Sequence, residues 1–172
     1  MHLVTKAALG LALIALAACN NPSKNGANGV VDPGGAFGEG AISQGSINDP
    51  NSPAYFSATV GDTVNFLVDQ STLSDQARTT LSGQAQWLNA HPNYAAIVEG
   101  HADEQGTREY NLALGARRAS AVQEYLISQG VSGSRLRTVS YGKERPLAVC
   151  SSEDCYFKNR RAVTVISLGA GS

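Results

Sequence analysis

The amino-acid sequence predicts an α/β (α+β) two-layer sandwich, with two long helices on one face of a mixed four-stranded sheet. Four short runs are rich in β-branched and aromatic residues, and two longer segments repeat apolar residues at helical spacing. These segments follow one another in the order β-α-β-α-β-β, which is typical of this fold class. The chain has 172 residues, enough for one domain with a substantial core.

The first strand and the first helix are expected between residues 63 and 92. The run "TVNFLVDQ" (63–70) alternates and is β-rich, which predicts a strand that ends at Asp69. Ser74 is a suitable N-cap for the helix, and Pro92 brings the helix to an end. The helix face directed at the core is marked by apolar residues at intervals of three or four: Leu73, Ala77, Leu81, Ala85 and Leu88.

The other elements follow the same reasoning. The apolar run "YAAIVEG" (94–100) predicts the second strand. Thr107 can cap the second long helix, and Gly130 is its natural C-terminal stop. The third strand is expected over 135–142 and the fourth over 162–168, separated by a loop that contains two cysteines.

The N-terminal residues 1–18 predict a lipoprotein signal peptide. Their apolar run (7–18) is too short to span a bilayer, which takes about 20 residues in a helix. The sequence "LAAC" resembles a bacterial lipobox, in which Cys19 carries a diacylglycerol and becomes the mature N-terminus. Asn20 stands where an Asp commonly signals inner-membrane retention, which favours the outer membrane. The alternative is an ordinary signal peptide with an incidental cysteine.

A flexible tether is expected over residues 19–58, followed by a domain over 59–172. The tether is rich in Gly, Asn, Ser and Pro and has few large apolar residues, so burial cannot offset the entropy of ordering it. A flexible segment of this length reaches roughly 30 to 35 Å. Such a tether suits a domain held near a membrane that contacts another layer.

Export also decides how the cysteine pair is interpreted. Cys150 and Cys155 lie in one short polar loop, "CSSEDC", and an exported domain meets an oxidising compartment. This favours a disulfide over a metal site, with two free thiols as the alternative.

Charged residues are found where the second expected strand leads into the second long helix: Asp103 in the loop and Arg118 on the helix. At about 100° per residue, Arg118 projects near the middle of an apolar helical stripe that contains Tyr110, Leu114, Ala121 and Tyr125. A buried guanidinium needs a partner, and Asp103 is the nearest acidic side chain in the loop. The pair is either a structural salt bridge or an open cleft, in which Asp103 attracts an ammonium and Arg118 clamps a carboxylate.

Three segments resemble a known family. "GHADEQGTREYNLALGARRASAVQEYL", "VSYGKERP" and "NRRAVTV" are similar to the OmpA C-terminal-like peptidoglycan-binding domain, over about residues 60–168. The resemblance implies that Asp103 binds the ammonium and Arg118 the carboxylate of diaminopimelate in the peptidoglycan stem peptide. It also implies a pocket framed by further residues: Asn111, Val68 and Asp69, with His101, Thr107 and Leu114 as pocket wall.

Two family positions leave questions open. Val68 stands where relatives often have a Phe, which removes an aromatic wall and alters the expected shape of the pocket. Arg160 and Arg161 match a family position, where they either border the site or form cross-strand charge pairs.

The resemblance implies a non-catalytic lipoprotein of the outer membrane, with its globular domain in the periplasm. It would bind peptidoglycan noncovalently and tether the outer membrane to the wall, with TolB and TolA as partners in the Tol-Pal system of envelope integrity and cell division. The alternatives are a TolB-docking scaffold with little wall affinity and a peptidoglycan-acting enzyme.

Several other function classes are disfavoured. The net charge of -1 gives no nucleic-acid footprint. A zinc deaminase needs a Glu two residues after its His and two residues between its cysteines, whereas Asp103 and a four-residue gap stand here. A hydrolase with paired carboxylates is disfavoured too, because a carboxylate next to an Arg is a poor general acid and Asp103 is expected near one. No metal or cofactor is expected.

Overall fold

The computed structural model of the protein describes residues 45–169. The expected signal peptide, the lipidation site Cys19 and residues 20–44 of the expected tether lie outside these residues. None of the helices in the described part is both long and apolar enough to cross a membrane.

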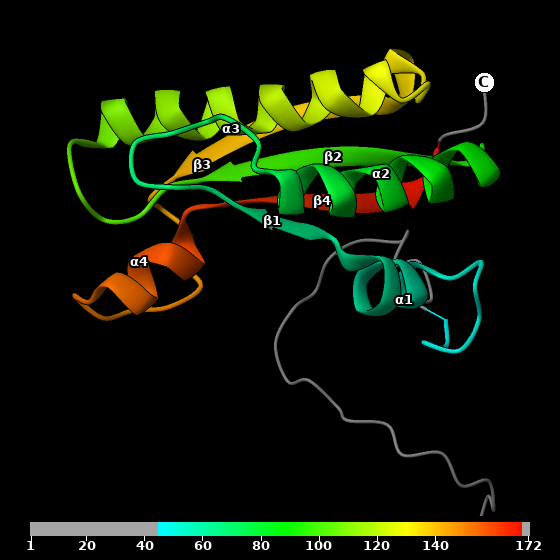
Figure 1. Ribbon diagram of the computed structural model, residues 1–172, viewed down its shortest axis with the longest axis horizontal. Coiled ribbons are helices and arrows are strands. Elements are labelled where there is room, and N and C mark those ends of the chain that lie inside the picture. The colour runs from blue at the N-terminus through cyan, green and yellow to red at the C-terminus, as the bar shows by residue number, and fades with distance from the viewer. Residues whose placement is uncertain (1–44, 170–172) are drawn as a thin grey trace, which may run out of the picture. The chain divides into compact units, whose positions relative to one another are not determined.

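Four strands form one mixed sheet in the order β1-β4-β2-β3 (Figure 1). Their bounds are β1 (Thr63–Asn65), β2 (Tyr94–His101), β3 (Leu136–Gly142) and β4 (Arg161–Leu168). β2 runs parallel to β3, while β4 is antiparallel to both β1 and β2. The predicted fold class is confirmed. Because β4 lies between β1 and β2, residues that are far apart in the sequence meet at one end of the sheet.

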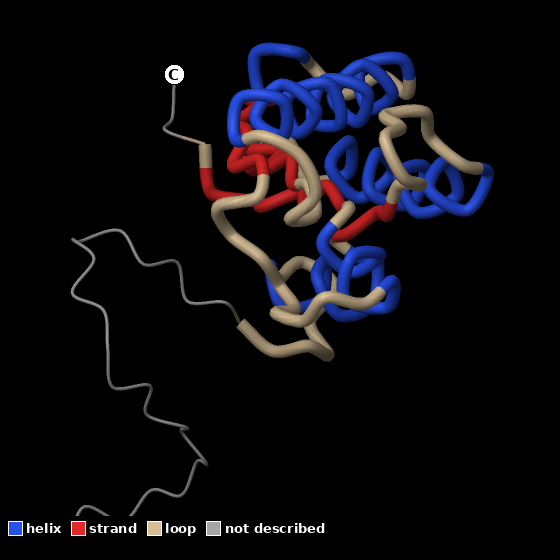
Figure 2. Tube along the Cα trace, turned by 90° about the vertical axis from the view of Figure 1, so that its left-hand side faces the viewer, coloured by secondary structure: helices blue, strands red, loops and turns tan. Residues whose placement is uncertain are grey.

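Two long helices, α2 (Asp75–Ala90) and α3 (Arg108–Ser128), cover one face of the sheet (Figures 1 and 2). Both predicted N-caps are confirmed: Ser74 Oγ accepts from the N–H of Ala77 at 3.1 Å, and Thr107 Oγ1 accepts from that of Tyr110 at 3.2 Å. The core between helices and sheet is apolar and includes Leu81, Leu88, Val98, Val122 and Leu126.

A close glycine contact brings α3 to the carboxyl end of β2. A Cβ atom placed on Gly100 would lie 1.8 Å from the carbonyl oxygen of Gly115. Only glycine at this strand position lets the helix approach so closely. The approach puts the carbonyl of His101 within hydrogen-bond distance of Arg118, one helical turn beyond Gly115.

The first strand is shorter than predicted. It ends at Asn65, although the N–H of Phe66 still donates to the carbonyl of Arg160 at 2.8 Å. The chain then turns away from the sheet over residues 67–70, which we call the 67–70 turn, and Asp69 has a positive φ of 55°. The expected end at Asp69 is therefore wrong. The strand stops because carbonyls of the turn bind Arg118 instead of a neighbouring strand.

Folded structure begins earlier than the expected boundary at residue 59. A short helix, α1 (Pro53–Tyr55), continues into the π-helix η1 (Phe56–Gly61). Phe56 is fully buried and packs 5.0 Å from the Trp87 ring of α2. The Trp87 indole donates to the carbonyl of Pro50 at 2.8 Å, so part of the expected tether packs on the domain.

The loop between β3 and β4 contains a helix that the sequence did not predict, α4 (Glu153–Asn159). A 3-10 turn, η2 (Gly133–Arg135), also precedes β3. Cys150 and Cys155 form a disulfide, with their Cα atoms 5.7 Å apart, the pairing favoured from the sequence. The disulfide joins the residues before α4 to its first turn.

Candidate functional site

Arg118 is fully buried, and it contacts three backbone carbonyls. Its Nε donates to Gln70 at 2.8 Å, its Nη1 to His101 at 2.8 Å and its Nη2 to Leu67 at 3.2 Å. The guanidinium carbon also lies 5.2 Å from the centre of the Phe66 ring, a cation–π contact. Burial is the main effect on this group and lowers the pKa of Arg118 to about 10. Its direct contacts are therefore with neutral groups, three carbonyls and one aromatic ring, and no carboxylate of residues 45–169 forms an ion pair with it.

The apolar stripe predicted on α3 is confirmed around Arg118 but not at Tyr110. Arg118 lies in the middle of the buried face, as expected, but Tyr110 is exposed. The buried face consists of Asn111, Leu114, Gly115, Arg118, Ala119, Val122 and Leu126.

Asp103 forms an ion pair, but with Arg160. Its Oδ2 accepts from Nη1 of Arg160 at 3.1 Å, and its Oδ1 accepts from the N–H of Gln105 at 3.1 Å. Of the two alternatives that the sequence left for Asp103 and Arg118, the direct structural salt bridge is therefore not formed. The pairing of β4 with β2 explains the exchange: Gly100 lies opposite Ala162, so the residue before Arg161 lies at the end of β2, next to the Asp103 loop.

Arg160 is only 2% exposed and binds two carboxylates, those of Asp103 and Glu153. Burial opposes its charge, but the hydrogen bonds that Arg160 donates to Glu153 and Asp103 prevail and raise the pKa of Arg160. Arg160 thus borders the site, which the sequence left open. Arg161 instead donates to the carbonyl of Arg145 at 3.3 Å.

Helix α4 and the disulfide hold the loop that carries Asp103. Glu104 Oε1 accepts from Ser151 Oγ and from the Tyr156 hydroxyl, both at 3.0 Å. The helix also supplies Glu153, which binds Arg160. The sequence carries a signal for this helix, with acidic residues in its first turn and Lys158 in its last, as the helix dipole favours.

Asn111 of α3, Lys143 and Thr107 also hold the loop that carries Asp103. Asn111 is buried, and its Nδ2 donates to the carbonyl of Gln105 at 2.7 Å. Lys143 Nζ donates to the carbonyl of Gly106 at 2.7 Å, and Gly106 has a φ of 92° that favours glycine. Thr107 caps the helix from an exposed position. These contacts place Asn111 and Thr107 as residues that shape the loop around Asp103.

The 67–70 turn lies over the Arg118 guanidinium. Leu67 is 61% and Val68 55% exposed, so both side chains point toward solvent. Asp69 Oδ1 accepts a hydrogen bond from the Tyr110 hydroxyl of α3. The turn is therefore attached to the domain mainly through Arg118 and Tyr110.

His101 is buried, and its carbonyl, not its ring, is bonded to Arg118. The ring lies 5.5 Å from that of Tyr141, and its Nε2 is 3.6 Å from Glu99 Oε2, which is too long for a hydrogen bond. Burial above all, with the charges of Arg161 and Arg145, lowers the pKa of His101 to about 4. The ring is neutral at pH 7, so its contact with Glu99 is not an ion pair at that pH.

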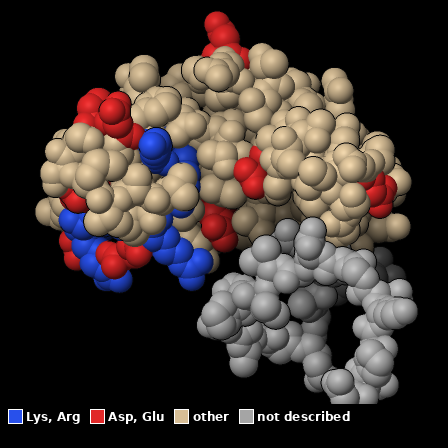
Figure 3. All heavy atoms as spheres, turned by 90° about the horizontal axis from the view of Figure 1, so that it is seen from below, with Lys and Arg blue, Asp and Glu red and all other residues tan. Residues whose placement is uncertain are grey.

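Charged side chains of both signs gather at the end of the molecule where α4 lies (Figure 3). Arg160, Asp103 and Glu153 meet at that end through their ion pairs, and Arg118 binds the strand residue that precedes the Asp103 loop. A ligand that carries both a positive and a negative group fits such a surface better than a ligand of one sign.

A family model described as the OmpA family matches residues 65–160. The peptidoglycan-associated lipoprotein of Mesorhizobium japonicum is 52% identical over 94% of this chain and 90% of its own length. That of Pseudomonas aeruginosa is 44% identical over 90% of this chain and 92% of its own.

Solved structures agree with these relatives. The crystal structure of the peptidoglycan-associated lipoprotein from Burkholderia pseudomallei matches with a TM-score of 0.63 and 40% identity, over 70% of this chain and 98% of that one. The C-terminal domain of Helicobacter pylori MotB matches with a TM-score of 0.59 at 24% identity, over 63% of this chain and 86% of that one, a likeness of fold.

Proposed function

The chain belongs to the OmpA family and within it to the peptidoglycan-associated lipoproteins, and we propose that its domain binds the diaminopimelate of the stem peptide noncovalently. The relatives carry the name of a wall-associated lipoprotein, and the OmpA-like fold is a binding domain, so the chain is a binding protein and not an enzyme.

The proposal rests above all on the buried charge of Arg118. A guanidinium in the interior is stable only with strong partners, and three neutral carbonyls are weaker partners than a carboxylate. A ligand carboxylate can accept two parallel hydrogen bonds from the planar guanidinium. Binding in this way would raise the pKa of Arg118 back toward its ordinary value.

A ligand reaches Arg118 only if the 67–70 turn moves, because the guanidinium is fully buried. The turn is suited to this. Its side chains at Leu67 and Val68 are exposed, and Asp69 adopts a left-handed conformation, which aspartate accepts more readily than most residues and which marks a tight turn outside the sheet. In the bound state, the ligand carboxylate replaces the carbonyls of Leu67 and Gln70, while the carbonyl of His101 keeps its hydrogen bond.

Asp103 is the partner proposed for the ligand ammonium. Arg160 and the N–H of Gln105 occupy one position on each carboxylate oxygen, and an ionised carboxylate has about four acceptor positions. Asp103 therefore retains acceptor capacity. Arg118 binds the carbonyl of His101, two residues before Asp103, so the two groups lie on neighbouring parts of the chain where one zwitterion could contact both.

The wider role is part of the same proposal. Lipidation at Cys19 would anchor the chain in the outer membrane with its domain in the periplasm, and wall binding would tether the two layers. TolB and TolA are the proposed partners in the Tol-Pal system. A TolB-docking scaffold with little wall affinity would bind TolB and leave sacculi unbound, which separates the two functions.

A pull-down with purified sacculi tests the binding claim. We expect Asp103→Asn and Arg118→Lys to weaken wall binding at least about tenfold, because each removes one charge or the fork geometry from the zwitterion clamp. Arg117→Lys is the matched control, since Arg117 is the exposed neighbour on the same helix. Wall binding equal to wild type in both Asp103→Asn and Arg118→Lys would overturn the proposal.

A further inference from the structure

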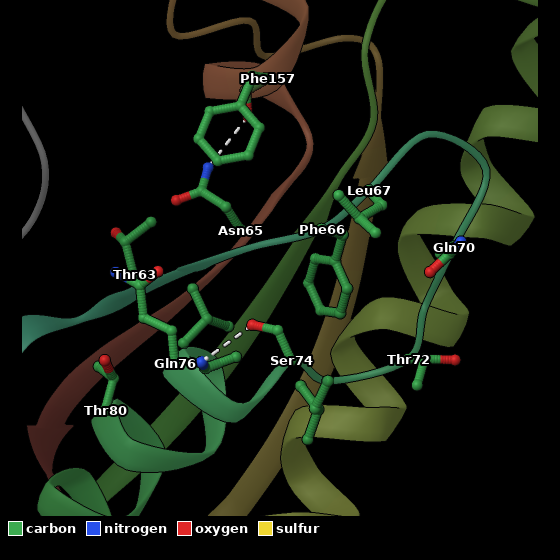
Figure 4. Close-up of a pocket in the computed structure, with 13 residues that line it drawn as sticks. Thr63, Asn65, Phe66, Leu67, Gln70, Thr72, Ser74, Gln76, Thr80 and Phe157 are labelled. Atoms are coloured by element: carbon green, nitrogen blue, oxygen red, sulfur yellow. Dashed lines mark hydrogen bonds between the residues drawn. The ribbon is translucent and has the colours of Figure 1, made fainter.

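A cavity of about 450 Å³ lies beside the 67–70 turn, on the side toward β1 and the first turns of α2 (Figure 4). Neither Arg118 nor Asp103 lines it. Leu67 and Gln70 do, however, and the carbonyls of these two residues bind Arg118. The cavity is therefore next to the proposed diaminopimelate site, separated from it by a single turn of the chain.

The lining of the cavity carries no charge. None of its 13 residues is Asp, Glu, Lys or Arg. Several of its polar side chains make no hydrogen bond with any residue in the part of the chain that the structure describes: Gln70, Thr72, Gln76 and Thr80. Two free amides and two free hydroxyls can donate to and accept from a neutral polar ligand, whereas an ionic ligand would find no counter-charge.

Apolar walls complete the cavity. The Phe66 ring is buried in one wall, and Phe157 of α4 stands at the rim with 46% of its surface exposed. Asn65 Nδ2 donates to the carbonyl of Phe157 at 3.0 Å, which holds the rim against β1. Apolar surface with a few polar groups is typical of small-ligand sites, and the volume lies within their usual range of about 300 to 1,000 Å³.

We propose that this cavity is a glycan subsite, which binds an N-acetylated amino sugar of the wall while the stem peptide of the same strand occupies the Arg118 site. The subsite rests on the proposed function. A sugar ring of this kind is uncharged, has hydroxyl and amide groups for Gln70, Gln76 and Thr72, and has an apolar face for Phe157. An apolar protein segment is a poorer occupant, because it would leave those amides and hydroxyls without partners.

The test is calorimetric titration of the full chain with three soluble probes: a stem peptide with diaminopimelate, the same peptide joined to its N-acetylated disaccharide, and the disaccharide alone. We expect the disaccharide-peptide to bind roughly tenfold more tightly than the peptide, the gain of one to two hydrogen bonds. Gln76→Ala with Thr72→Val should remove that gain and leave the affinity for the peptide unchanged.

Gln86→Ala is the matched control, an exposed glutamine of the same helix outside this cavity. The outcomes separate the two sites. If the peptide binds and the disaccharide adds nothing, the subsite is wrong and the Arg118 site stands. If the peptide fails but the disaccharide alone binds and depends on Gln76, the subsite stands and the Arg118 site is wrong. If no probe binds, both are wrong.

Discussion

Arg118 and Arg160 are both buried next to the same loop, yet their partners differ. Arg160 binds the carboxylates of Asp103 and Glu153, whereas Arg118 binds only the carbonyls of Leu67, Gln70 and His101. Carboxylates of the protein neutralise the charge of Arg160, whereas the charge of Arg118 is stabilised by backbone dipoles. The first arrangement positions the loop, and the second leaves a cation that a ligand carboxylate can neutralise.

This difference in partners predicts that replacing the two arginines lowers the free energy of unfolding by unequal amounts. Arg160→Met leaves the buried carboxylate of Asp103 without its ion partner, which we expect to cost about 3 kcal/mol of unfolding free energy. Arg118→Met removes a charge that has no ion partner, and the carbonyls of Leu67 and Gln70 lie in an exposed turn where water can replace the guanidinium. Only the carbonyl of His101 then stays buried and unpaired, so we expect a smaller loss of about 1 kcal/mol. Urea unfolding measures both, and equal losses would contradict the assignment of the two roles.

Removing the disulfide should weaken the contacts of Arg160 and leave those of Arg118 unchanged. Cys150→Ser with Cys155→Ser frees the segment before α4, and we expect a loss of about 2 kcal/mol from the short closed loop. Glu104 and Arg160 then lose part of their support, so wall binding should fall while the contacts of Arg118 persist. Val149→Ser, at an exposed residue next to the bridge, provides a control for local polarity. Unchanged stability after loss of the bridge would show that α4 is held by other contacts.

Acid should destabilise the domain through His101, whose carbonyl supports Arg118. The pKa of this ring is about 4 in the folded protein, against an ordinary value of 6.5 that applies to an unfolded chain. Below pH 6.5 the unfolded state binds the proton first, so stability falls as the pH drops and levels off near pH 4. We expect a loss of about 2 kcal/mol, less than the full shift implies, because solvent near the site screens the charge.

Thermal unfolding between pH 7 and pH 4 measures this loss. The His101→Gln variant should have a flatter stability profile over that interval. A profile as steep as that of the wild type would show that another group carries the pH dependence.

The smallest effect concerns the attachment of the 67–70 turn. Tyr110→Phe removes the hydrogen bond to Asp69 at an exposed position, so stability should change by less than about 0.5 kcal/mol. Because the turn then opens more easily, affinity for a diaminopimelate peptide should rise about twofold. Weaker binding of the peptide, measured by calorimetry, would show that the Tyr110 contact belongs to the bound state and not to the closed one.

Much of the fold could be predicted because its signals are local. Ser74 and Thr107 cap their helices through contacts three residues away, and the apolar spacing before Pro92 marks a buried face. The stripe on α3 likewise located Arg118 in the interior. Helical phase alone therefore identified the buried arginine of the candidate site.

The remaining features depend on contacts that are distant in the sequence. Arg160 meets Asp103 only because β4 lies between β1 and β2, an order that spacing does not reveal. The first strand ends early because Arg118, far along the chain, binds the carbonyls of its last expected residues. Helix α4 is short and lies in a polar loop, where hydrophobic periodicity gives no signal.

The proposed role of Arg118 as the carboxylate clamp is tested most directly by ¹⁵N NMR of the arginine side chains during titration with a diaminopimelate stem peptide. We expect a large change in the Nε–H signal of Arg118, which exchanges the carbonyl of Gln70 for the ligand carboxylate, and a small change for Arg160. Saturation of the binding site with no change at Arg118, or with an equal change at both arginines, would contradict this role.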